Sequence, residues 1–96
     1  MNKQIILDLL KKNKTLFKQK YNVTKIGLFG SYATNHQTEN SDIDILVSMP
    51  SSFDNYYELK EVLESSLNHK VDLGLEKNVR DLLRNRINKE VIYAWQ

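Results

Sequence analysis

The sequence contains no cysteine, one proline and three glycines among its 96 residues. Without cysteine the chain can form neither a disulfide nor a thiolate metal site, which fits a reducing compartment such as the cytoplasm. Fourteen basic residues stand against twelve acidic ones, so the net charge is only +2. This balance is too even to indicate nucleic-acid binding by itself, and no specific nucleic-acid partner is predicted.

Long apolar runs are absent as well. Asp8 interrupts the first apolar residues too early for a signal peptide, and no stretch is long enough to span a bilayer. The composition, 41% hydrophobic and 27% charged, is typical of a globular protein. We therefore expect a single cytoplasmic domain over residues 1–96, with no membrane association.

The spacing of apolar residues predicts helices that alternate with strands. Helical spacing covers 3–20, 53–67 and 79–90, and strand patterns cover 23–29, 42–48 and 70–75. Strands separated by helices favour an α/β fold, a small mixed sheet of about three strands with helices packed on it. A long crossover joins the second and third strands, which favours a parallel pairing between them.

Gly30 and Ser31 directly follow the first predicted strand. Glycine allows backbone to approach a phosphate closely because it has no Cβ, and Ser31 adds a hydroxyl donor. Ser31 is also expected to cap a short helix that continues through Ala33, and a helix N-terminus favours an anion. Ser52 is expected to cap the helix that begins at Phe53. The Gly-Ser turn is therefore a candidate phosphate-binding turn.

Paired aspartates follow this turn on the second predicted strand. Asp42 and Asp44 are two residues apart, so they share one face, about 6.5 Å apart along the strand. Asp72 lies on the polar face of the third predicted strand and joins them if the two strands are neighbours. Three carboxylates in one cluster repel each other and call for cations between them. Two magnesium ions bound by these oxygens would meet that need.

The turn and the carboxylates together predict one reaction. Two metal ions can hold a nucleoside triphosphate, activate an attacking hydroxyl and stabilise the pyrophosphate that leaves. The predicted activity is magnesium-dependent, in-line transfer of a nucleotidyl group. Each piece alone has an ordinary structural explanation, because Asp-x-Asp and Gly-Ser pairs are common. Their order, spacing and facing in combination carry the prediction.

These residues resemble the nucleotidyltransferase superfamily that includes polymerase β. Its signature is present as Gly30-Ser31-Tyr32-Ala33, then Ser41-Asp42-Ile43-Asp44-Ile45, then Val71-Asp72-Leu73. Within that superfamily the chain is similar to the minimal nucleotidyltransferases (MNT), antitoxins that are paired with HEPN toxins. The similarity extends to Ile26–Phe29 before the turn and to Arg84–Tyr93 near the end of the chain.

The resemblance implies a role for each signature residue. Gly30 and Ser31 would hold the triphosphate, and Asp42 and Asp44 would bind magnesium. Asp72 would complete the metal site and help to activate the acceptor hydroxyl. The resemblance further implies transfer of AMP from ATP to a tyrosine of the partner HEPN ribonuclease, which silences that toxin.

The chain departs from the family pattern directly after the signature turn. The family often has Arg-Gly where this chain has Thr34 and Asn35. Asparagine tolerates a left-handed turn, so Asn35 can replace the glycine. Thr34 cannot supply a guanidinium to phosphate. Other basic candidates for that task, each also readable as an ordinary surface charge, are Lys25, Lys77 and Arg80.

Two other functions stay open from the sequence. The chain can neutralise a toxin by binding alone, although a pure binder has no need of clustered carboxylates. It can also transfer nucleotides to a small molecule such as an aminoglycoside, although such enzymes usually carry a further acceptor domain. Tyr93 and Trp95 are compatible either with a partner interface or with packing on the chain's own core.

Overall fold

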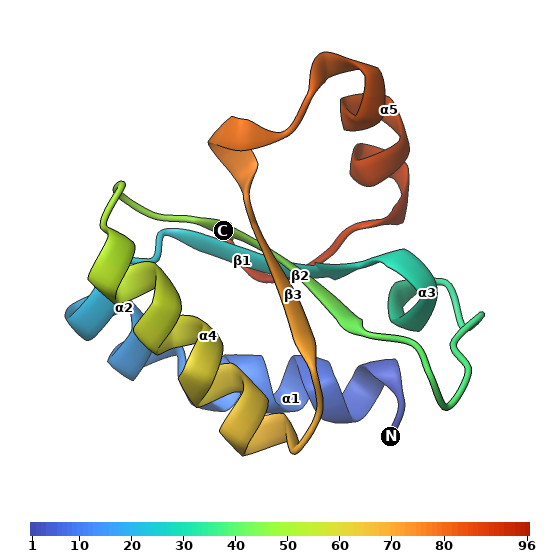
Figure 1. Ribbon diagram of the computed structural model, residues 1–96, viewed down its shortest axis with the longest axis horizontal. Helices are drawn as coiled ribbons and strands as arrows, with labels where there is room; N and C mark the ends of the chain where they lie inside the picture. The colour runs from blue at the N-terminus through green and yellow to red at the C-terminus, as the bar shows by residue number, and fades with distance from the viewer.

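The computed structural model describes all residues, 1–96, as helices packed on one mixed sheet (Figure 1). The elements in chain order are α1 (Lys3–Lys12), α2 (Lys14–Tyr21), β1 (Lys25–Phe29), α3 (Gly30–Ala33), β2 (Ile43–Ser48), α4 (Phe53–Leu67), β3 (Val71–Leu75), a 3₁₀ turn η1 (Glu76–Asn78), α5 (Asp81–Glu90) and β4 (Ile92–Trp95). The predicted α/β fold is confirmed, with four strands in place of about three.

The sheet has the strand order β3-β2-β1-β4. β2 and β3 run parallel, as the long crossover between them predicts, whereas β1 is antiparallel to both of its neighbours. α4 forms the crossover and begins where predicted, with the side chain of Ser52 accepting a hydrogen bond from the Asn55 N–H. This topology places β2, the strand with the paired aspartates, in the middle of the sheet.

One face of the sheet is covered by α1, α2 and α4 (Figure 1). The alternate residues of the strands that point to these helices are fully buried, as the period-2 pattern predicts. They meet a helical stripe in one continuous core, whose most buried members are Ile6, Leu10, Phe17, Ile26, Leu28, Ile43, Ile45, Leu59 and Leu63. The opposite face carries no such helical layer, except for α3 and α5 at its end (Figure 1).

The predicted helix over 3–20 is interrupted at Asn13, which separates α1 from α2. The Asn13 side-chain amide donates a hydrogen bond to the Leu9 carbonyl, at 2.8 Å. Asparagine side chains compete in this way with the helical backbone pattern, and the apolar spacing alone does not reveal the break. Both helices still pack on the same core through Leu10 and Phe17.

The fourth strand, β4, is the main difference from the sequence prediction. It pairs antiparallel with β1, with Gly27 opposite Tyr93 and Leu28 opposite Ile92. Trp95 is buried and lies 6.4 Å from the Phe17 ring, centroid to centroid. Of the two alternatives for the aromatic residues near the end of the chain, the structure shows packing on the chain's own core for Trp95.

The helix predicted over 79–90 begins later, at Asp81, because η1 and two extended residues precede it. No residue of α5 is buried, and the Leu82 side chain is 93% exposed. α5 therefore projects from the sheet rather than covering it (Figure 1). None of the helices is long and apolar enough to cross a membrane.

Replacing Trp95 tests whether β4 belongs to the core. Trp95→Ala removes a large buried side chain and is expected to lower the free energy of unfolding by roughly 3 kcal/mol. Leu82→Ala, at a fully exposed leucine, is the matched control and should change it by less than about 0.5 kcal/mol. Urea unfolding followed by circular dichroism measures both, and equal stabilities of the two variants would contradict the assignment.

Candidate active site

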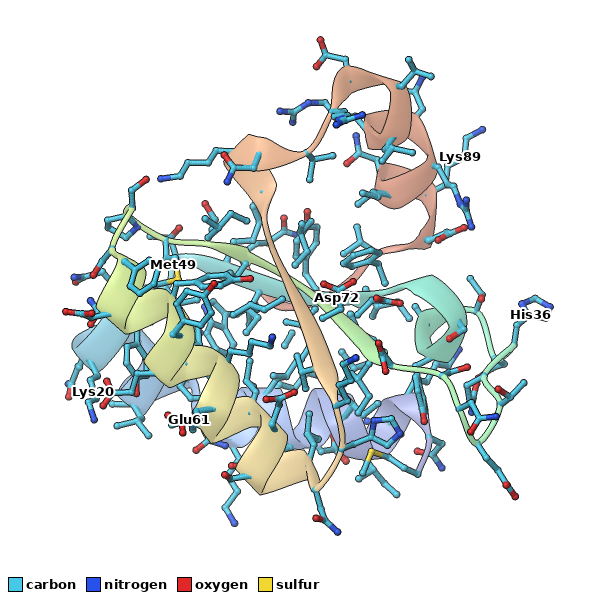
Figure 2. All side chains as sticks on the ribbon, in the orientation of Figure 1. Lys20, His36, Met49, Glu61, Asp72 and Lys89 are labelled. Carbon is cyan, nitrogen blue, oxygen red and sulfur yellow. The ribbon has the colours of Figure 1, made fainter.

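The residues singled out by the sequence meet at one end of the sheet, where β1 enters α3 and β2 begins. Ile43 and Ile45 point into the core, so strand alternation puts Asp44 on the opposite face. Asp72 on β3 also points away from the core and is exposed. Figure 2 shows Asp72 on the side of the sheet that faces α5.

Asp44 and Asp72 lie directly opposite each other in the parallel register of β2 and β3. The pKa of Asp44 is raised to about 6, first by burial and then, in decreasing order, by the charge of Asp72, the charge of Asp42, a hydrogen bond with Asp72 and the charge of Glu90. The half-buried Asp44 therefore lies close to the exposed carboxylate of Asp72. The sequence argument that Asp72 approaches the paired aspartates is consistent with this register.

Asp42 lies one residue before β2 and is partly exposed. Its Oδ2 atom is 3.9 Å from the Nζ atom of Lys70, in a loose surface ion pair. It remains near enough to Asp44 to raise that residue's pKa. Asp42 is thus in the same electrostatic field as the Asp44–Asp72 pair, while its carboxylate is turned toward a lysine.

The donor set at this position suits a hard divalent cation. Carboxylate oxygens are the ligands that Mg²⁺ prefers, and the charges of Asp72 and Asp42 add to burial in raising the pKa of Asp44. The side chains are not yet arranged as a closed site, because no group of three Asp, Glu, His or Cys residues converges on a metal position. The residues fit magnesium in chemistry, with Asp42 needing to turn from Lys70.

The turn that carries the Gly-Ser pair packs against Asp44. Gly30 has a φ of 73°, in the left-handed region that favours glycine. A Cβ atom at Gly30 would lie 2.2 Å from Oδ2 of Asp44. The glycine thus serves two purposes, since it turns the chain and makes room for the carboxylate.

The prediction that Ser31 caps the short helix is wrong. The helix α3 begins at Gly30, Phe29 occupies the cap position, and no side chain accepts a hydrogen bond there. The left-handed turn at Gly30 starts the helix one residue early and places Ser31 inside it. Thr34 closes the helix instead, because its hydroxyl donates to the Gly30 carbonyl at 3.1 Å. Asn35 adopts a φ of 60°, as expected for a substitute for glycine.

A cavity of about 220 Å³ lies beside the turn and Asp44. It is lined by Phe29, Gly30, Asp44, Leu83, Arg86, Ile87 and Glu90. Arg86 and Glu90 come from α5, and their side chains are joined by an ion pair, Nε to Oε1, of 3.2 Å. The sequence argument gave neither residue a role, although their spacing of four on a helix marks them as neighbours.

The basic residues considered from the sequence lie elsewhere. Lys25 pairs with Glu76 at 3.1 Å and lies over the Tyr93 ring. Lys77 contacts the Ser51 hydroxyl. Arg80, like Lys25 and Lys77, does not line the cavity beside Asp44. Arg86 is the one cation that does.

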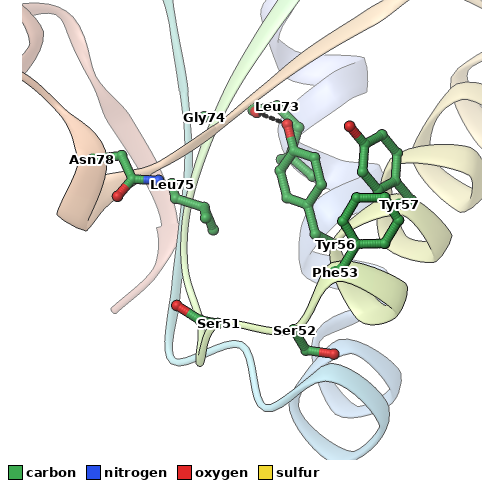
Figure 3. Close-up of a pocket in the computed structure, with 9 residues that line it drawn as sticks. All are labelled: Ser51, Ser52, Phe53, Tyr56, Tyr57, Leu73, Gly74, Leu75 and Asn78. Atoms are coloured by element: carbon green, nitrogen blue, oxygen red, sulfur yellow. Dashed lines mark hydrogen bonds between the residues drawn. The ribbon is translucent and has the colours of Figure 1, made fainter.

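A larger cavity, about 550 Å³, lies between β3, η1 and the start of α4 (Figure 3). Its wall is aromatic, with Phe53 and Tyr57 exposed, and the Tyr56 hydroxyl donates to the Leu73 carbonyl. Neither the Gly30–Ser31 turn nor any of the three aspartates Asp42, Asp44 and Asp72 lines it. The smaller cavity is therefore the one that adjoins the predicted chemistry.

A glycine turn, a strand-borne carboxylate pair and an adjoining cavity with one arginine lie together at one end of this α/β domain. Residues 9–94 match the nucleotidyltransferase domain family. The chain belongs to that family and is an enzyme of the nucleotidyltransferase class.

Relatives of similar length share much of the sequence. A Methanocaldococcus jannaschii protein named "putative protein adenylyltransferase" is 44% identical over 94 residues, covering 93% of this chain and 94% of the relative. Protein adenylyltransferase MntA of Thermococcus cleftensis is 33% identical over 91 residues, covering 93% of this chain and 92% of the relative.

Two solved structures are similar across almost the whole chain. One, described as a "putative minimal nucleotidyltransferase", has a TM-score of 0.80 at 26% identity and covers 96% of this chain and 95% of that one. The other, a toxin–antitoxin with AMP-PNP, has a TM-score of 0.71 at 30% identity and covers 99% of this chain and 73% of that one. The second supports a nucleotide as the substrate of this family.

Asp44 makes the stability of the metal-free protein depend on pH. The folded protein holds the Asp44 proton more tightly than the unfolded chain, since the pKa rises from 3.8 to about 6 on folding. Stability should therefore fall as pH rises from about 4 to about 6, by roughly 1 to 2 kcal/mol once solvent screening of a half-exposed group is allowed for. Unfolding by urea at a series of pH values, with EDTA present, measures the slope.

Asp44→Asn should remove this contribution and increase stability at pH 7.5. Glu39→Gln is the control, since it changes an exposed loop carboxylate with no hydrogen bond or ion pair in the structure. If Asp44→Asn left the pH slope unchanged, the crowding of carboxylates at Asp44 would be refuted.

Gly30→Ala tests the close contact between the turn and Asp44. The new Cβ would clash with the Asp44 carboxylate, and alanine would be strained at this positive φ. The free energy of unfolding of the variant should therefore fall by roughly 1 to 3 kcal/mol. At Gly74 a Cβ would meet only ordinary contacts, the nearest at 3.8 Å, so Gly74→Ala should be tolerated. Thermal unfolding of the two variants compares them, and a fully stable Gly30→Ala protein would contradict the geometry.

Proposed function

We propose that this chain is the antitoxin of a toxin–antitoxin pair and transfers AMP from ATP to a tyrosine of a cognate HEPN toxin. The observation that carries the proposal is the in-register pair Asp44 and Asp72 beside the Gly30 turn. The relatives named protein adenylyltransferase support the AMP transfer, and the similar toxin–antitoxin structure with AMP-PNP supports a toxin as the partner. Residues 1–96 would act as one catalytic unit, with the acceptor supplied by the partner.

In the proposed reaction the acceptor tyrosine oxygen attacks the α-phosphorus of ATP. A bond forms between these two atoms, the bond to the β-phosphate bridging oxygen breaks, and pyrophosphate leaves. Asp72, the exposed member of the carboxylate pair, would take the proton of the acceptor hydroxyl. Asp72 suits this role because it lies on β3, the edge strand that a partner can approach.

The Gly30–Ser31 turn would contact the phosphates. Gly30 carries no side chain toward the cavity, and the first N–H groups of a helix have no partner within that helix. Magnesium, if held by Asp42, Asp44 and Asp72, would supply positive charge to the triphosphate and lower the pKa of the attacking hydroxyl.

The test uses the chain together with the product of the gene adjacent to its own, as the candidate toxin. With α-labelled ATP and magnesium, the wild-type protein should label the toxin, and peptide mass spectrometry should place AMP on tyrosine. Asp44→Asn and Asp72→Asn should each lower the rate by about 100-fold or more, since each removes a carboxylate of the reacting site. Glu39→Gln should keep the wild-type rate.

Absence of label on the toxin with folded protein would refute the transfer. If the Asp42→Asn, Asp44→Asn double variant neutralised the toxin as well as wild type, neutralisation by binding alone would replace the proposal. Transfer to an aminoglycoside without any toxin present would favour a small-molecule substrate. Omitting magnesium or adding EDTA should stop the labelling, and retained activity there would refute the metal requirement.

A further inference from the structure

The cavity beside Asp44 is poorly suited to a polyanion unless a cation balances its acids. Asp44 and Glu90 both line it. Asp72 and Asp42 add their charges from the adjoining strands. A triphosphate that enters this field is repelled by several carboxylates at once. Arg86 is the single basic residue among those that line the cavity.

The guanidinium of Arg86 is held at one edge and free at the other. Its Nε atom donates to Oε1 of Glu90 at 3.2 Å, and no hydrogen bond from its Nη atoms to the protein is present. The Arg86 side chain is 74% exposed and that of Glu90 only 23%. Glu90 therefore anchors the arginine beside the cavity and leaves the outer N–H groups able to bind a ligand.

Other cations near the site are less suited to this task. Lys70 pairs with Asp42 and Lys25 pairs with Glu76, and neither lysine lines the cavity. Arg84 lies on the same helix as Arg86 but pairs with Asp81, and it does not line the cavity. Arg86 alone combines a place at the cavity with free donors.

We propose that Arg86 binds the terminal phosphates of the nucleoside triphosphate and that Glu90 is the residue that positions it. A guanidinium matches phosphate oxygens with two parallel hydrogen bonds, which an ammonium group cannot form. This inference rests on the proposed function, since it assumes that the Gly30 turn and Asp44 face the phosphates. It gives the chain a phosphate-binding arginine from α5, at a distance in sequence from the Gly-Ser turn.

Binding of ATP and AMP to the isolated chain, measured by calorimetry with magnesium, tests the assignment without catalysis. Arg86→Gln should weaken ATP binding about 10- to 100-fold, because charge-assisted hydrogen bonds to phosphate are lost. AMP lacks the terminal phosphates, so the affinity of Arg86→Gln for AMP should differ from that of wild type by less than about threefold. Arg84→Gln, a matched loss of charge on the same helix, should leave both affinities within about twofold.

Two further variants separate positioning from general structure. Arg86→Lys keeps the charge but not the paired donors, so its affinity for ATP should lie between those of wild type and Arg86→Gln. Glu90→Ala should weaken ATP binding about three- to tenfold, whereas Glu90→Gln, which still offers an acceptor to Nε, should restore most of the affinity. Failure of Glu90→Gln to improve on Glu90→Ala would refute the positioning role.

The outcomes distinguish this inference from the function on which it rests. If wild-type protein binds ATP and labels the toxin but Arg86→Gln binds ATP equally well, only the arginine assignment is overturned. Equal losses for ATP and AMP would also overturn it, since the terminal phosphates would not be the target. If wild-type protein bound no ATP, both proposals would fail.

Discussion

The parallel pairing of β2 with β3 determines the rest of the site. Its register puts Asp44 directly opposite Asp72, and the pleat keeps both carboxylates on the same face. A slip of one residue would turn Ile43 and Ile45 out of the core and the acids into it. Burial of these isoleucines thus offsets the repulsion between the carboxylates. The core, rather than any contact within the site, sets the distance between the two acids.

The antiparallel pairing of β1 with β2 places the Gly30 turn beside the carboxylates. Phe29 at the end of β1 lies opposite Asp44, so the turn at Gly30 must pass directly over that carboxylate. A left-handed residue without a Cβ is what such a close approach requires. The Gly30 turn and the Asp44 carboxylate are therefore neighbours because of strand register, even though they lie 14 positions apart in the sequence.

The first three strands could be predicted because period-2 alternation is read directly from the sequence. The approach of Asp72 to Asp44 could be predicted because the long crossover favours a parallel pairing of β2 with β3. β4 could not, since it has four residues and no glycine or proline separates it from α5. The break at Asn13 depends on one side-chain hydrogen bond that apolar spacing does not register. The place of Arg86 and Glu90 beside Asp44 cannot be predicted from the sequence. Hydrophobic periodicity shows which residues share a face of α5, but not where α5 lies relative to the sheet.

The position of α5 relative to the sheet is hard to predict for a physical reason. The helix buries no side chain, so hydrophobic burial contributes little to holding it above the sheet. Its position is set by the strands at either end, β3 through η1 and β4, and by its contact with α3. In the proposed role, a triphosphate held by both the Gly30 turn and Arg86 would connect α5 to the sheet by ionic contacts. A ligand that binds only the arrangement in which both partners face it stabilises that arrangement by mass action. In that role the weak packing of α5 would make the position of this helix depend on bound nucleotide, unlike that of a helix held by a buried apolar face.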